Sequence, residues 1–207
     1  MTKLTNNSLQ ERKETMLMIA EEVFAQYSFA GATIRLIAER SGMNSAMISY
    51  YFGSKEALYL NIFKLRLEEM AQEISRFELL DLDPLKKLNA YLTTYIGRVV
   101  SNQNFNRLLC NELVSVQHSS IIAQLSEARN RLYNFLLKMI TSGIAKGYFK
   151  KIDEEVFVLN VLALVRSVFT DHLTTRIHLN ELPQRNFARR IVDYLMSTIT
   201  IEDPPSN

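Results

Sequence analysis

The chain has 207 residues with a formal net charge of only +2, so it is long enough for a sizeable core, and its charge argues against a non-specific nucleic-acid coat protein. A hydrophobic content of 47% with six Gly and four Pro leaves few helix breaks, so we expect an almost entirely α-helical fold. The single cysteine, Cys110, excludes an intramolecular disulfide framework. The N-terminal residues do not form the apolar segment that would predict export, so we expect a cytoplasmic location.

The first predicted helix follows a polar tail of residues 1–7. Ser8 and Glu11 have the spacing of a capping box, in which each side chain accepts a backbone N–H of the other residue, so the helix should begin there. Its apolar residues recur at helical spacing to Tyr27, and Gly31 should break the chain. The expected buried face consists of Met16, Ile19, Ala20, Val23, Phe24 and Tyr27.

Residues 33–58 divide into a short helix, a tight turn, a second short helix and the start of a third. Thr33 can cap the first helix by accepting a backbone N–H, and Gly42 can adopt the left-handed conformation that ends it. Asn44 can cap the second helix at once, and Ser54 precedes the third. The segment therefore predicts two short helices joined by a glycine turn.

The second short helix is predicted to expose most of its side chains. Met43, Ile48 and Phe52 should face the core, which leaves the other positions outside: Ser45, Ala46, Met47, Ser49, Tyr50 and Tyr51. Small, hydroxyl and aromatic side chains on an exposed helix suit insertion into the DNA major groove. An ordinary helical corner, or a Tyr50–Tyr51 surface that binds another protein, is the alternative.

The run T-x-x-x-I-A-x-x-S-G-x-N-S-A-x-I-S-Y-Y-F-G-S-K-E-A-L over these residues resembles the N-terminal domain of the TetR family of bacterial transcriptional regulators. The resemblance implies that residues 45–51 form the recognition helix and that Thr33, Tyr51 and Lys55 contact phosphate. The sequence departs from the common pattern at Ala46, where Gly is frequent, and at Ser49, where Tyr is frequent. The predicted DNA-binding residues are Thr33, Arg35, Asn44, Ser45, Ala46, Met47, Ser49, Tyr50, Tyr51 and Lys55.

The remaining chain reads as a helical bundle. A long helix should run over residues 55–77, and Asp83 followed by Pro84 is a strong helix start. Further helices are expected over about 104–116, from Ser119 or Ser120 to about residue 146, from Asp153 to about residue 175, and from near Pro183. The helix that follows Asp153 is apolar around nearly its whole circumference, so it needs cover on every side. This favours a homodimer in which this helix and the last helix pack against the same two helices of a second copy.

A small-molecule pocket is predicted within this bundle, as the TetR resemblance implies. The candidate lining residues are polar side chains in apolar helices: Tyr91, Tyr95, Arg107, Asn111, Asn160 and Arg166, with Asp171 and His172 beside them. Arg166 has two interpretations, since it can neutralise a ligand anion or form a structural pair with Asp171, Glu112 or the other subunit. The three histidines do not have the spacing of metal ligands, so we expect no metal site. The sequence has no phosphate-binding loop and no nucleophile motif, so we expect no cofactor and no enzyme activity.

The sequence thus predicts an all-α protein of about nine helices. Residues 1–54 should form a three-helix DNA-binding domain with a helix-turn-helix, and residues 55–207 a helical domain for effector binding and dimerisation. The implied function is a TetR-like repressor that leaves a palindromic operator when a small molecule binds; the alternative is a helical protein-interaction module that does not bind DNA. No membrane partner is expected.

Overall fold

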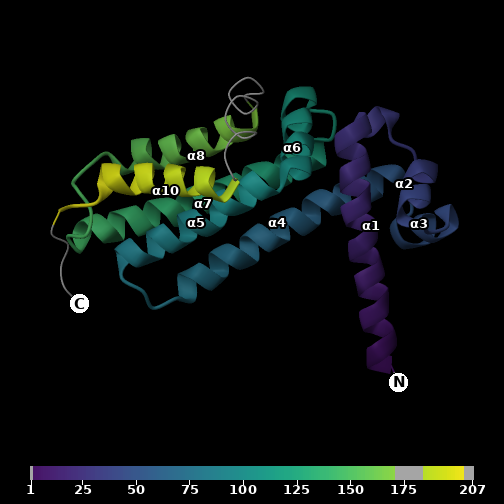
Figure 1. The fold of residues 1–207 in the computed structure, drawn as a ribbon, viewed down its shortest axis with the longest axis horizontal. Helices are drawn as coiled ribbons and strands as arrows, with labels where there is room; N and C mark the ends of the chain where they lie inside the picture. Colours follow the sequence, from purple (N-terminus) through teal and green to yellow (C-terminus); the bar gives the residue numbers. More distant parts are fainter. Residues whose placement is uncertain (1, 171–183, 203–207) are drawn as a thin grey trace. The chain divides into compact units, whose positions relative to one another are not determined.

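The computed structural model describes residues 2–170 and 184–202, which form nine helices and one isolated β-bridge between Phe149 and Thr200. The helices are α1 (Thr2–Gly31), α2 (Ile34–Ser41), α3 (Ser45–Phe52), α4 (Lys55–Leu79), α5 (Pro84–Ser101), α6 (Gln103–Ser115), α7 (Ser119–Ala145), α8 (Glu154–Thr170) and α10 (Gln184–Ile199) (Figure 1). The predicted all-α class is confirmed. Across these described residues, no helix is both long and apolar enough to cross a bilayer.

The chain divides into two compact units, which are described separately. Unit 1 comprises Met1–Glu69 and Asn104–Leu125, and unit 2 comprises Met70–Gln103 and Ser126–Asn207. Unit 1 is larger than the predicted head of residues 1–54 because it includes the first part of α4 and a second segment with α6. The functional division at residue 54 stays a prediction.

Helix α1 begins earlier than its sequence indicated. It starts at Thr2 instead of the predicted Ser8, because no proline or glycine interrupts residues 2–7. Its regular part ends near the predicted Tyr27, since Ser28 leaves helical geometry with φ 59 and ψ 172. A serine in this sparsely populated region costs conformational energy, so surrounding packing must hold the kink.

The core of unit 1 forms where α1, α2, α3 and α4 meet. Helix α2 packs against α1 and α3, as the ribbon shows (Figure 1). The fully covered apolar side chains include the predicted positions Met16, Ala20, Val23, Phe24, Ile37 and Ile48 together with Leu58, Tyr59, Ile62 and Phe63. Tyr27 and Ile19 lie at the edge of this core rather than inside it.

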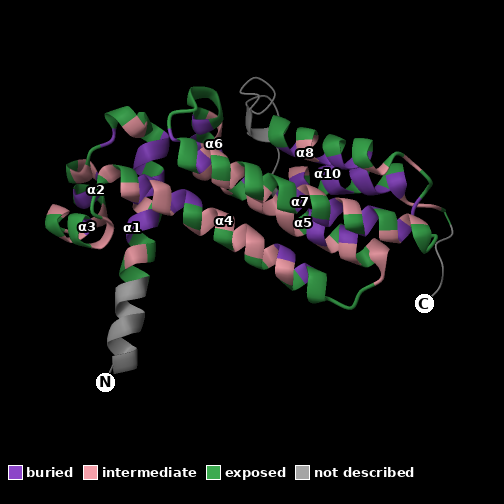
Figure 2. Ribbon diagram, turned by 180° about the vertical axis from the view of Figure 1, so that it is seen from behind, coloured by how far each residue is buried: buried purple, intermediate pink, exposed green. Residues whose placement is uncertain are grey.

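Unit 2 is a bundle in which α10 packs along α5 and α8 also contacts α5. Buried and exposed segments alternate along α5, α7 and α10 in Figure 2, as expected for helices with one covered face. The predicted starts at Asp83 and Asp153 are confirmed, since their carboxylates accept the backbone N–H groups of Lys86 at 2.8 Å and Val156 at 3.0 Å. The predicted start near Pro183 lies outside the described residues.

Candidate nucleic-acid interface and buried polar cluster

The predicted caps of α2 and α3 are confirmed. The hydroxyl of Thr33 accepts the N–H of Leu36 at 3.1 Å, and the side chain of Asn44 accepts the N–H of Ala46 at 2.9 Å. Gly42 has the left-handed φ of 64 that ends α2, with open space around its α-carbon. These local signals therefore set a tight turn between two eight-residue helices.

Helix α3 is held by Ile48 and exposes the opposite side. Ile48 is buried, whereas the side chains of Ala46, Ser49 and Tyr50 are exposed, and Tyr50 keeps 84% of its surface in solvent. Of the other predicted recognition residues, Ser45, Met47 and Tyr51 are half-buried. The face available for contact with a groove is therefore narrower than predicted and centres on Tyr50.

One positive side chain, Lys13, lies close to an aromatic group of α3. The Lys13 amine lies 5.5 Å from the centre of the Tyr51 ring, whose edge meets the Tyr50 ring at 5.4 Å between centroids. Arg35 is exposed on α2, and the cap residues Thr33 and Asn44, which precede α2 and α3, are exposed as well. The surface thus offers positive charge beside an edge-to-face aromatic pair, which suits a phosphate backbone.

Lys55 makes contacts that the resemblance did not imply. Its ammonium donates to the backbone carbonyls of Phe29 at 2.9 Å and Ala32 at 3.1 Å and lies over the Phe29 ring at 4.5 Å. These carbonyls follow the kink at Ser28, where helical hydrogen bonding is interrupted. Lys55 therefore joins the start of α4 to the α1–α2 connection, and its predicted phosphate contact stays a prediction.

A buried triad supports this unit and was not foreseen. The carboxylate of Glu112 accepts the Tyr59 hydroxyl at 3.1 Å and both the backbone N–H and Nδ1 of His118, at 2.9 and 2.8 Å. Burial, and then the Glu112 charge, raises the pKa of Tyr59, which keeps its hydroxyl a donor. The position of Glu112 four residues after Leu108, on the covered face of α6, is the sequence signal that could have revealed it.

A second buried carboxylate, Glu21, pairs with Arg66 inside the same unit. Arg66 donates to Glu21 through Nε at 2.8 Å and Nη2 at 3.1 Å, and to Glu69 at 3.2 Å. The paired geometry fixes α1 against α4 more specifically than apolar contact does. The sequence signal is again an acid among apolar neighbours, here between Leu17 and Phe24.

The predicted pocket residues fall into separate groups. Arg107 and Asn111 belong to unit 1 and are exposed, and the Arg107 guanidinium donates to the Ala25 carbonyl at 3.4 Å. Asn160 and Arg166 are exposed on α8 in unit 2. Tyr91 and Tyr95 are brought together on α5, whereas Asp171 and His172 lie outside the described residues.

Tyr91 and Tyr95 form a buried polar cluster with Glu73 and Arg98, which the sequence had not indicated. Their rings stack at 5.9 Å between centroids, Arg98 lies over Tyr95, and its guanidinium donates to Glu73 at 2.9 Å. Within the described residues, neither the Tyr91 hydroxyl nor the Glu73 Oε1 atom has a hydrogen-bond partner, although both are buried. Burial raises the pKa of Glu73 against the effect of Arg98 and raises that of Tyr95 to about 12.

Replacing Tyr91 by Phe should raise the free energy of unfolding by about 1 kcal/mol, because it removes a desolvated hydroxyl that no protein group satisfies. Urea unfolding followed by circular dichroism measures the change. Tyr59→Phe is the matched control: it removes the buried hydroxyl that donates to Glu112 and should lower the same free energy by about 1 kcal/mol. Equal losses in both variants would contradict the assignment.

An α2–turn–α3 corner packed on α1, with α3 open to solvent, defines a helix-turn-helix protein. Residues 17–62 match the family model described as "Bacterial regulatory proteins, tetR family". The helix-turn-helix region of the chain is therefore similar to the DNA-binding region of this family of bacterial regulators. Among the described residues no three His, Cys, Asp or Glu side chains gather as a metal site.

Similar proteins carry the names of regulators. The chain is 27% identical over 110 residues to the transcriptional regulator RutR of Escherichia coli K12, a match over 53% of this chain and 51% of RutR, so it spans about half the length of that relative. It is 26% identical over 160 residues to the repressor NicS of Pseudomonas putida, over 75% and 73% of the two chains. The solved structure of the ketosteroid regulator KstR2 of Mycobacterium tuberculosis shares the fold, with a TM-score of 0.76, 15% identity and coverage of 92% and 96%. These matches do not favour the alternative of an interaction module without DNA binding.

Proposed function

We propose that the protein is a transcriptional repressor that binds operator DNA through α3. The observation that carries the proposal is the exposed Tyr50 side chain on a short helix anchored from behind by Ile48. A capped helix of this kind can enter the major groove, where side chains of its outer face reach base edges. Lys13, Arg35 and the α2 N-terminus at Thr33 then face phosphate.

Replacing Tyr50 by Ala should weaken specific operator binding by about 1–3 kcal/mol per lost base contact, because its side chain is the largest on the exposed face of α3. Fluorescence anisotropy with duplexes from the DNA that flanks the gene measures the loss. Affinity for unrelated DNA should change little, because that binding is with phosphate.

Val114→Ala is the control for this variant. Val114 lies in the same compact unit, outside the helix-turn-helix, and is 86% exposed, so its truncation should change affinity less than twofold. If the wild-type protein bound every flanking duplex with the same affinity, the proposal that it binds an operator would be overturned. Equal losses in Tyr50→Ala and Val114→Ala would overturn the role of α3.

We infer further that two copies bind one palindromic operator. The support is an exposed apolar stripe on α8, where Val156, Leu159 and Ala163 recur at helical spacing beside Asn160. A second copy would cover this stripe, and the two α3 helices of such a dimer would need to lie about 34–36 Å apart to reach successive major grooves. A footprint should then show two symmetric half-sites. A protein that binds operator DNA would act in the cytoplasm, which is the location that we propose.

The buried polar cluster is the proposed effector site. Its support is the two unsatisfied buried atoms, Tyr91 hydroxyl and Glu73 Oε1, which a ligand with a donor and an acceptor would satisfy. Effector binding must favour a state with lower operator affinity, and the operator must lower effector affinity by the same factor. Helix α4 belongs to both units, so it is the covalent route for this coupling.

A further inference from the structure

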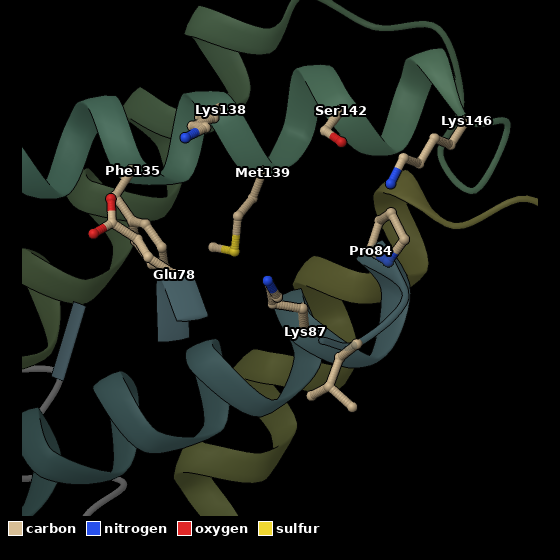
Figure 3. A pocket seen from close by; sticks show the side chains of 9 residues that line it. Glu78, Pro84, Lys87, Phe135, Lys138, Met139, Ser142 and Lys146 are labelled. Atoms are coloured by element: carbon tan, nitrogen blue, oxygen red, sulfur yellow. The ribbon is translucent and has the colours of Figure 1, made fainter. Parts of the chain in front are cut away.

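A pocket of about 140 Å³ lies in unit 2, and none of the predicted pocket residues lines it. It is bordered by the end of α4, the start of α5 and the second half of α7 (Figure 3). The lining residues are Glu78, Leu82, Pro84, Lys87, Phe135, Lys138, Met139, Ser142 and Lys146. Phe135 and Met139 are buried and give the pocket an apolar wall.

The charges around this wall are unevenly placed. Within the described part of the chain, none of Lys87, Lys138 and Lys146 forms an ion pair, whereas the neighbouring Lys86 pairs with Asp83 at 2.9 Å. Figure 3 shows the Glu78 carboxylate beside Phe135, toward the Lys138 end of the pocket. In this view the amino group of Lys87, from α5, lies below Met139, and that of Lys146, directly after the end of α7, lies beside Pro84.

Lys87 and Lys146 both border this pocket without an ion pair to any described residue, so a bound anion would be attracted to both ammonium groups. A carboxylate can accept charge-assisted hydrogen bonds from both lysines, while an attached apolar body gains free energy against Phe135 and Met139. A volume of about 140 Å³ suits a compact aromatic or short aliphatic body rather than a long chain.

We propose that this pocket binds a small organic carboxylate, with its charge between Lys87 and Lys146 and its apolar body against Phe135 and Met139. The site is distinct from the buried polar cluster, although Phe135 also packs edge-on against Tyr91 at 4.7 Å between centroids. The proposal goes beyond operator binding and does not require it, so it is tested on the full chain without DNA.

Benzoate is the test ligand, and the methyl group of Met139 is the reporter. In protein labelled with ¹³C at its methionine methyl groups, benzoate should produce a saturable shift of the Met139 signal, which a Met139→Leu variant assigns. Met16, buried in the core of unit 1, provides a signal that should stay in place. Benzamide, which has the same shape without charge, and acetate, which has the charge without the ring, should each bind at least about tenfold more weakly.

Lysine variants test whether benzoate binds to the lysines of the pocket or only responds to the net charge of the protein. Lys87→Gln and Lys146→Gln should each weaken benzoate binding by about fivefold or more, since each removes one charge-assisted hydrogen bond. Lys151→Gln makes the same change in net charge at an exposed position outside the pocket and should alter affinity less than about twofold. Helical circular dichroism checks that each variant is folded.

Three results would overturn the proposal: no shift at Met139, equal affinity for benzamide and benzoate, or a loss in Lys151→Gln as large as in the pocket variants. The last would mean that benzoate responds only to overall positive charge. Because no DNA is present, failure here leaves operator binding untouched, and failure of operator binding leaves this site untouched.

Discussion

Glu112→Ala is expected to lower the free energy of unfolding by about 3–5 kcal/mol, the largest effect of any single substitution considered. Glu112 is buried and accepts three hydrogen bonds, from Tyr59 and from two groups of His118. Removal of the carboxylate leaves all three donors desolvated without an acceptor, and each such group costs about 1–3 kcal/mol. The shortened side chain also leaves a cavity beside Tyr59, whose ring packs on Phe24 and Phe63.

Two further variants separate the lost hydrogen bonds from lost packing. Glu112→Gln keeps the shape and one acceptor oxygen, so its loss should be smaller, about 1–2 kcal/mol. Glu127→Ala removes an exposed acid of α7 and should change stability by less than about 0.5 kcal/mol. Chemical denaturation of all three gives the comparison. A loss for Glu112→Ala no greater than that for Glu127→Ala would show that the triad does not stabilise the fold.

Gly143→Ala should lower the free energy of unfolding by about 3 kcal/mol through steric overlap. A β-carbon at residue 143 would overlap the Cδ2 and Cε2 atoms of the Phe149 ring and lie 3.1 Å from Cζ. Phe149 cannot withdraw easily, because it is buried and its neighbour Lys150 donates its backbone N–H to the Ile199 carbonyl at 2.8 Å. Thermal and urea unfolding measure the change.

Gly97→Ala is the matched control, since Gly97 is also a helical glycine of unit 2 but has no atom near its added β-carbon. This substitution should raise stability by about 0.5–1 kcal/mol by reducing the freedom of the unfolded chain. In a Phe149→Val background, which lacks the overlapping ring atoms, Gly143→Ala should cost less than about 1 kcal/mol. A large loss that persists in that background would place the cause elsewhere.

The helix boundaries show how far local sequence signals reach. Thr33, Gly42, Asn44, Asp83 and Asp153 act within four residues of themselves, and all five have the predicted conformation or hydrogen bond. The capping box at Ser8 did not start α1, because a cap can be bypassed when the preceding residues also tolerate a helix. Helix α1 ends at Gly31 as predicted, whereas no glycine in the sequence indicated the kink at Ser28.

The candidate sites show what local sequence signals cannot predict, which is contact between residues on different helices. Tyr50 is exposed as the amphipathic pattern of α3 predicts. By contrast, Lys55 and Arg98 find their partners 23 or more residues away, and Glu112 pairs with Tyr59, 53 residues away, and with His118 across a turn. Spacing along one helix cannot reveal a partner on another. The sequence therefore shows that Glu21 and Glu112 lie on the covered faces of their helices, but it does not show which residues they bind.

For this protein the amino-acid sequence by itself determined the all-α class, most helix ends and the helix-turn-helix with Tyr50 outermost, because capping and amphipathic periodicity depend on neighbours within one or two turns. Only the tertiary structure decided that Lys55 binds backbone carbonyls, that Glu112 joins Tyr59 and His118, and that three lysines border an apolar pocket. These arrangements depend on how separate helices pack, and a buried polar group takes whichever partner that packing brings within hydrogen-bonding distance.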